Sequence, residues 1–170
     1  MELRLTEAVI AVNEEVKARM IGKIAELCGG DLKGRTVAVL GVTFKPNTDD
    51  MREAPALAII PALQAQGARV RVVDPQGRRE GEHLLPGVDW AEDPYAAADG
   101  AHLVAILTEW NQFRALDLKR LARAMAAPRL ADLRNIYDPQ DVQAAGFQAY
   151  AGVGRTGFGG AAEERTAAAE

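Results

Sequence analysis

The chain has 170 residues, of which 48% are hydrophobic and 26% are charged. These proportions are typical of a soluble globular protein, and the length favours a single domain. The net charge of −4 argues against a nucleic-acid-binding protein, which would carry a basic face. Because the sequence has no membrane-spanning apolar run, no secretion signal and a single cysteine, we expect a cytoplasmic protein without an internal disulfide.

The first segment, about residues 5–28, is predicted to form an amphipathic helix. Apolar residues recur there at spacings of three and four: Leu5, Val9, Val12, Val16, Met20, Ile24 and Leu27. Gly29 and Gly30 end the helix. A helix this long, beginning almost at the first residue, suggests a chain taken from a larger protein. Its simplest role is to pack on the sheet of its own domain.

A buried strand over 36–41 is followed by a polar loop, a helix over 55–66 and a second strand over 69–74. In an open α/β sheet, ligands bind beyond the carboxyl ends of the strands, where the start of the next helix favours phosphates. Lys45 and Arg52 add positive charge to this loop.

The loop lacks the glycine fingerprint of a dinucleotide-binding fold, which needs three closely spaced glycines so that main chain can approach a pyrophosphate. Only Gly41 is present, and the bulky Val42, Thr43 and Phe44 follow it. A diphosphate would therefore have to be held by side chains. Asp74, at the end of the second strand, is interpreted as a turn-opening residue rather than a ribose ligand.

Further strands are expected over 87–91, 102–108, 129–133 and 147–150, and helices over 93–98, 116–125 and 138–145. This order predicts an α/β fold, a Rossmann-like doubly wound parallel sheet preceded by the long N-terminal helix. His83 is expected in a loop and His102 at a strand end, and neither has a second ligand at metal spacing. Cys28 is interpreted as a small buried thiol. We therefore assign no metal site and no catalytic residue.

Three segments, in this order, carry a resemblance to a known family: Phe44–Pro55, Leu107–Phe113 and Asp132–Pro139. They are similar to motifs of the C-terminal, nucleotide-sugar-binding domain of the UDP-glucose/GDP-mannose dehydrogenase family, and the resemblance spans about residues 8–155. Thr48–Arg52 and Thr108–Trp110 look most like the UDP-glucose branch. The branches that use UDP-N-acetyl-sugars or GDP-mannose stay open.

The resemblance implies part of an enzyme. Family members oxidise C6 of a UDP-sugar to a carboxylate with two equivalents of NAD, through a cysteine thiohemiacetal and thioester. Their amino-terminal domain binds NAD and supplies the cysteine, and their C-terminal domain holds the nucleotide portion of the sugar. This chain resembles only the C-terminal domain, so it is expected to be inactive alone, with NAD bound mainly by the absent domain.

The resemblance also implies partners and domain limits. In the family, a central helix with a Val-Asn-Glu sequence, matched here by residues 12–14, joins the two domains and supports a homodimer. The implied organisation is a connecting and dimerisation helix over 1–33, a nucleotide-sugar-binding domain over 34–155 and a flexible tail over 156–170. A stand-alone binding or dimerisation module of the same fold, without turnover, remains the alternative.

Four site residues are carried over by the resemblance. Phe44 and Lys45 should contact the substrate, and Arg134 should approach it. Arg52 should reach across the domain cleft to NAD. The family usually has glycine before the last arginine, whereas Leu133 stands here and could crowd the backbone or shift Arg134. Acidic neighbours are expected to orient the cations: Asp49, Asp50 and Glu53.

Overall fold

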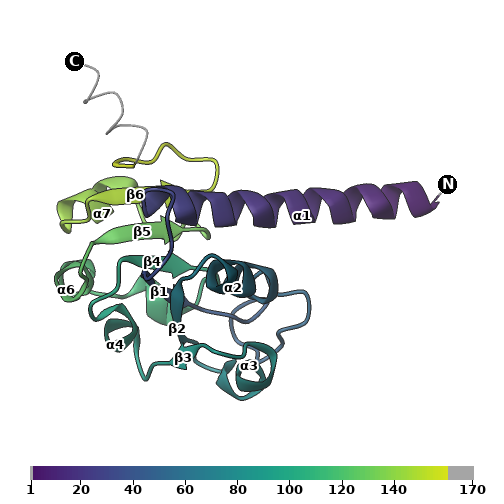
Figure 1. Cartoon of the computed structure of the whole chain (residues 1–170), viewed down its shortest axis with the longest axis horizontal. Helices are drawn as coiled ribbons and strands as arrows, with labels where there is room; N and C mark the ends of the chain where they lie inside the picture. The colour runs from purple at the N-terminus through teal and green to yellow at the C-terminus, as the bar shows by residue number, and fades with distance from the viewer. Residues whose placement is uncertain (1, 161–170) are drawn as a thin grey trace.

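The computed structural model describes residues 2–160, with side chains from Thr6 onward. The chain forms one six-stranded parallel sheet in the order β3-β2-β1-β4-β5-β6 (Figure 1). The strands are β1 (Thr36–Leu40), β2 (Arg69–Val73), β3 (Asp89–Trp90), β4 (Leu103–Ile106), β5 (Arg129–Asp132) and β6 (Ala149–Gly152). This order is that of a doubly wound dinucleotide-type fold, so the predicted Rossmann-like sheet is confirmed.

Helices cover both faces of this sheet. They are α1 (Glu2–Leu27), α2 (Ala56–Ala65), α3 (Arg78–Leu84), α4 (Pro94–Ala98), α5 (Asn111–Arg114), α6 (Leu118–Ala124) and α7 (Pro139–Ala144). Val37 and Val39 of β1 belong to the core that includes residues of α1 and α2, whereas Ala38 and Leu40 belong to the core that includes residues of α4, α6 and α7. The central strands are therefore buried on both sides, which explains their uninterrupted apolar sequence.

Three of the helices begin at an aspartate that satisfies otherwise unpaired backbone N–H groups. Asp93 accepts from Tyr95 N and Ala96 N at the start of α4. Asp117 caps α6 and Asp138 caps α7 in the same way. These local signals fix where the helices start, and they lie at or within one or two residues of the predicted starts.

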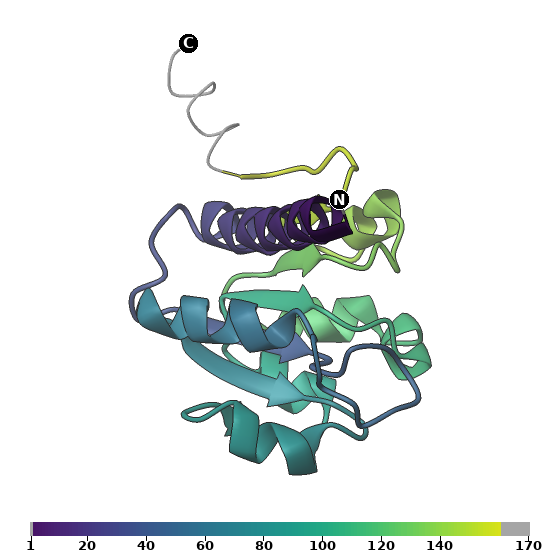
Figure 2. The ribbon, with the colours of Figure 1, turned by 90° about the vertical axis from the view of Figure 1, so that its right-hand side faces the viewer.

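The predicted long N-terminal helix is confirmed, but only part of it is packed. Ile24 and Leu27 are almost fully buried in the core. Residues 6–15 are all exposed, and this half of α1 projects beyond the sheet (Figure 1). Val9, Ile10 and Val12 have exposed fractions of 56%, 56% and 54%. Figure 2 shows α1 on the β6 side of the sheet and α3 at the opposite end of the molecule.

The prediction of a loop around His83 is wrong, because Arg78–Leu84 forms helix α3 and His83 lies in its last turn. The glycines of this segment favoured a loop, but Gly81 has a packing role within the helix. A Cβ at Gly81 would lie 2.5 Å from the Trp90 ring. Glycine therefore lets α3 approach β3. Helix α5 was not predicted, and β6 starts at Ala149 rather than at residue 147.

The last described residues pair with strand β6. Tyr150 N donates to Phe158 O at 2.8 Å, Phe158 N donates to Tyr150 O at 3.1 Å, and the two rings stack with centroids 5.9 Å apart. The rest of the tail expected over 156–170, from residue 161 onward, lies outside the described residues. None of the helices within residues 2–160 is both long enough and apolar enough to cross a membrane.

Gly41, which ends β1, allows a close approach of β1 and β4. Its φ is +86°, and a Cβ there would lie 2.5 Å from Thr108 Cβ. Thr108 Oγ1 donates to Thr43 O at 2.7 Å across the same gap. This glycine therefore serves the packing of two strand ends.

We predict that Gly41→Ala lowers the free energy of unfolding by about 2–5 kcal/mol, because it combines a left-handed backbone with overpacking. The matched control is Gly30→Ala, where φ is +85° and nothing lies within 4 Å of the added Cβ. At Gly30, only the added backbone strain should lower the free energy of unfolding, by about 1–2 kcal/mol. Urea denaturation measures both values, and equal losses would contradict the packing role of Gly41.

Candidate functional site

The loop between β1 and α2 carries Phe44, Lys45 and Arg52. It is closed at its base by a hydrogen bond from Phe44 N to Asp50 O at 2.8 Å. Met51 is only 2% exposed and packs in the core, which anchors the returning part of the loop. The residues between these points form a projecting tip at the carboxyl edge of the sheet.

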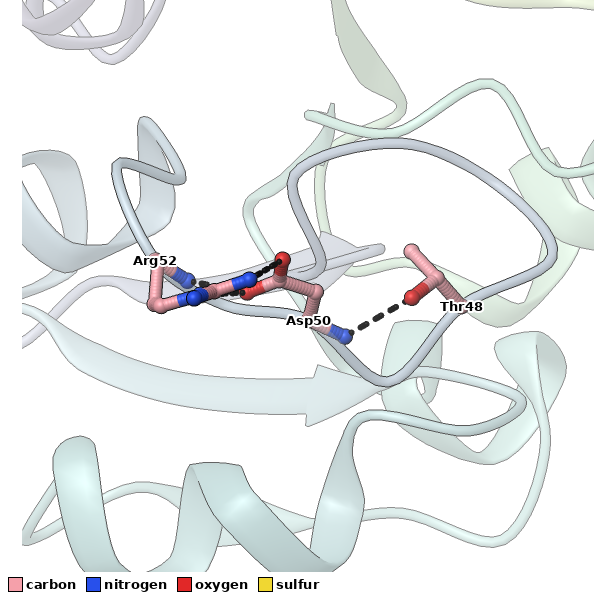
Figure 3. Close-up of polar contacts among 3 residues, drawn as sticks. All are labelled: Thr48, Asp50 and Arg52. Carbon is pink, nitrogen blue, oxygen red and sulfur yellow. Dashed lines mark hydrogen bonds and ion pairs between the residues drawn. The ribbon is translucent and has the colours of Figure 1, made fainter.

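Arg52 is held by Asp50 within this loop (Figure 3). Its Nε and Nη2 atoms donate to the two carboxylate oxygens of Asp50 at 3.0 and 2.8 Å, and its backbone N donates to Oδ1 at 2.9 Å. Asp50 N in turn donates to Thr48 Oγ1 at 3.1 Å. The bonds from Arg52 lower the pKa of Asp50 to about 2. The Arg52 side chain stays 89% exposed, so the pair orients the guanidinium without burying it.

Lys45 lies at the exposed tip and makes no ion pair within residues 2–160. Its charge adds, after the effects of Arg52, to the lowering of the pKa of Asp50. Phe44, beside it, is 49% exposed. Of the acidic residues expected to orient the cations, Asp50 does so, whereas Asp49 and Glu53 form no ion pair in the described chain.

Arg134 follows β5 in a turn that is organised by a buried acid. Asp132 is fully buried and accepts from Ile136 N at 3.1 Å and Tyr137 N at 2.9 Å. Arg134 Nε donates to Glu109 Oε2 at 2.5 Å, and this bond lowers the pKa of Glu109. Glu109 follows β4, so the contact joins the ends of two adjacent strands.

Leu133 does not crowd this turn. Its side chain is 3% exposed and belongs to the core cluster that includes residues of α1 and α2. Its backbone N donates to Ile106 O at 3.2 Å, which continues the pairing of β4 and β5. The leucine thus points into the core while Arg134 extends to Glu109.

Asp74, which follows β2, is a second buried acid at this edge, with 8% exposure. Its Oδ1 accepts from Gln76 N at 3.0 Å and Gly77 N at 2.7 Å, so its predicted role as a turn opener is confirmed. Its Oδ2 accepts from Val42 N at 2.7 Å, Thr43 N at 3.2 Å and Trp110 Nε1 at 3.3 Å. The sequence did not predict this second set of bonds, which links the ends of β1, β2 and β4.

All four predicted site residues therefore lie on loops at one edge of the sheet. β1, β4 and β5 are neighbours, and their carboxyl ends carry Lys45, Glu109 and Arg134 respectively. A cavity of about 510 Å³ adjoins this edge, lined by residues 48–52 and by Glu80 and Leu84 of α3. Arg52 lines this cavity, whereas Phe44, Lys45 and Arg134 do not.

The remaining candidates lie away from this edge. Cys28 is 3% exposed, and burial raises the pKa of its thiol. His102 Nδ1 accepts from Thr36 N at 3.0 Å, which confirms a locally satisfied strand-end residue. Burial, followed by the charges of Arg35 and Arg129, lowers the pKa of His102. Among the described residues, no three His, Cys, Asp or Glu side chains are grouped so as to hold a metal ion.

Comparison with known proteins gives a family match over most of the domain. Residues 38–139 match the model of the UDP-glucose/GDP-mannose dehydrogenase family, UDP binding domain. The UDP-glucose 6-dehydrogenase of Rhizobium meliloti (strain 1021) is 51% identical over 153 residues, which cover 90% of this chain and 35% of that protein. The UDP-glucose 6-dehydrogenase TuaD of Bacillus subtilis (strain 168) is 39% identical and covers 89% of this chain and 33% of that protein.

A solved structure agrees with these relatives. The UDP-glucose dehydrogenase of the archaeon Pyrobaculum islandicum superposes with a TM-score of 0.74 at 34% identity. The match covers 92% of this chain and 33% of that one. The chain thus spans about a third of the length of the proteins it matches.

We predict that Arg52→Ala raises the pKa of Asp50 from about 2 toward its ordinary value of 3.8, because the two side-chain bonds to the carboxylate are lost while the bond from the backbone N of residue 52 remains. A lowered pKa in the folded state means that the pair helps stability above about pH 4. This contribution is lost as the pH falls through about 2. Carboxyl NMR titration measures the pKa. Arg52→Lys should give an intermediate value, and an unchanged pKa in Arg52→Ala would refute the assignment.

Proposed function

The chain belongs to the UDP-glucose/GDP-mannose dehydrogenase family, and from this membership we propose that it is the UDP-binding domain of an NAD-dependent UDP-glucose 6-dehydrogenase. The observation that carries the proposal is the carboxyl edge of the sheet, where Lys45 is exposed and without an ion pair in the described chain, and Arg134 reaches Glu109 at the end of β4. We propose UDP-glucose rather than another nucleotide sugar because the relatives of 51% and 39% identity are UDP-glucose 6-dehydrogenases.

Side chains are suited to hold the nucleotide here. An ammonium group such as that of Lys45 can donate to phosphate oxygens in many directions, and a guanidinium such as that of Arg134 offers paired donors. Phe44 is 49% exposed beside Lys45 and offers a ring face to the nucleoside or the sugar. In this proposal, Phe44, Lys45 and Arg134 bind the UDP-sugar.

The residues after β1 do not fit the pyrophosphate of NAD. The N–H groups of Val42 and Thr43 are already donated to Asp74, and the segment has bulky side chains where a glycine-rich loop would be needed. We therefore place NAD on an N-terminal domain of the same enzyme. Arg52, which is 89% exposed and oriented by Asp50, is the residue that would reach toward it.

The proposed reaction is the oxidation of UDP-glucose to UDP-glucuronate. This chain contributes nucleotide binding and orientation, whereas the cysteine nucleophile and the hydride acceptor belong to the N-terminal domain. Cys28 takes no part, because it is buried at the end of α1 and its pKa is raised. The isolated chain is therefore expected to bind the substrate without turning it over.

We predict that UDP and UDP-glucose at millimolar concentration raise the melting temperature of the 170-residue chain. Lys45→Ala should weaken this binding about tenfold, since one charge-assisted contact to phosphate is lost. Lys119→Ala, at an exposed position of α6, is the matched control and should behave like the wild type. Thermal shift and calorimetry give the two measurements. No shift with UDP or UDP-sugars would remove the basis of the proposed function.

The exposed half of α1 supports a homodimer as part of the same proposal. Val9 and Val12, which are 56% and 54% exposed and three residues apart, present an apolar stripe on a helix that projects from the domain (Figure 1). Such a surface is costly to leave in water, and a second copy of the helix would cover it.

We predict that the double variant Val9→Glu with Val12→Glu shifts the chain from dimer to monomer, because it places charges in the apolar stripe. Ala11→Glu is the control, since residue 11 lies on the other side of the helix at about 100° per residue. Light scattering coupled to size-exclusion chromatography measures the mass. A monomeric wild type, or a double variant that stays dimeric, would contradict a dimer formed through α1.

A further inference from the structure

The main-chain N–H groups that follow β1 are used in an unusual way. In a dinucleotide-binding fold, the N–H groups of this turn and of the helix start point at a pyrophosphate. Here Val42 N and Thr43 N donate at 2.7 and 3.2 Å to Oδ2 of Asp74, which comes from the end of the neighbouring strand. A carboxylate of the chain itself therefore takes the donors that a phosphate would take.

This carboxylate has no capacity left for a ligand. Asp74 accepts six hydrogen bonds, from Val42 N, Thr43 N, Thr43 Oγ1, Gln76 N, Gly77 N and Trp110 Nε1. A carboxylate offers about four lone-pair positions, so all of them are occupied. The residue is also only 8% exposed. It cannot hold a ribose hydroxyl, as an acid at the end of the second strand does in dinucleotide folds.

We infer that Asp74 is a built-in anion that replaces a bound phosphate at the end of β1, closes this position to dinucleotides and fixes the loop that carries Phe44 and Lys45. Thr43, which gives two of the six bonds, directly precedes Phe44. Trp110, which gives another, directly follows Glu109, the partner of Arg134. One carboxylate thus positions the supports of Lys45 and of Arg134.

The negative charge of Asp74 is compatible with a nearby anion site because donors surround it. Its two oxygens face N–H and O–H groups of three loops, and the carboxylate is shielded from solvent. Lys45 and Arg134 remain the groups that a phosphate can reach. The positioning role of Asp74 rests on the proposed function, whereas its role as an anion substitute does not.

The first test is chemical rescue of Asp74→Ala in the 170-residue chain. The variant should melt below the wild type, and sodium formate should recover at least about 2–4 °C of this loss, because a small carboxylate can occupy the vacated position. Sodium chloride at the same concentration should not. Asp117→Ala, which removes an exposed carboxylate that accepts Arg120 N, is the matched control and should show no specific response to formate.

An equal response of both variants to formate and chloride would overturn the role of Asp74 as a built-in anion. If Asp74→Ala does not fold, Asp74→Asn decides the question. An asparagine amide must turn its NH₂ group toward one set of donors, so hydrogen exchange should become faster at residues 42–43 or at 76–77. Unchanged exchange in Asp74→Asn would overturn the inference.

The second test measures positioning through UDP affinity. Asp74→Asn should weaken UDP binding about tenfold, and this loss should shrink when Lys45→Ala is already present. Additive losses, or full affinity in Asp74→Asn, would overturn the positioning role alone. A wild type that binds no UDP would instead overturn the proposed function together with that role, and the formate test would still decide whether Asp74 replaces a bound anion.

Discussion

The site depends on one buried carboxylate that holds three loops together. The loops after β1, β2 and β4 leave the sheet next to one another, and Asp74 supplies acceptors to donors from each of them. Gly41 adds to this by letting the end of β4 approach the end of β1. Lys45 therefore lies on an exposed loop whose base is held in place, because Val42 N and Thr43 N donate to Asp74.

The fold was largely predictable because its elements carry local signals. Strands buried on both faces have uninterrupted apolar sequences, and aspartates mark the starts of three helices. The error at α3 has a tertiary cause. Gly81 weakens the helical signal in the sequence, but the Trp90 ring requires it, and no local rule shows that a ring from β3 will lie there.

The site was predictable only in part. A family motif indicated Lys45, Arg52 and Arg134, and the sequence spacing between Asp50 and Arg52 made their pairing an open possibility. The contacts of Asp74 with Trp110 and of Arg134 with Glu109 join residues 36 and 25 positions apart, and they follow only from the order of the strands. The sequence did contain a signal for these loop-organising carboxylates, because an aspartate lies at the end of two parallel strands, at Asp74 and Asp132.

The two outer strands of the sheet affect how readily the protein aggregates at high concentration. β3 is only two residues long, and β6 is partly covered by the backbone of Phe158. Neither border offers a long row of unsatisfied peptide groups on which a foreign strand could be templated. A short return of the chain past β6 thus protects the protein from edge-to-edge aggregation, independently of any role in binding.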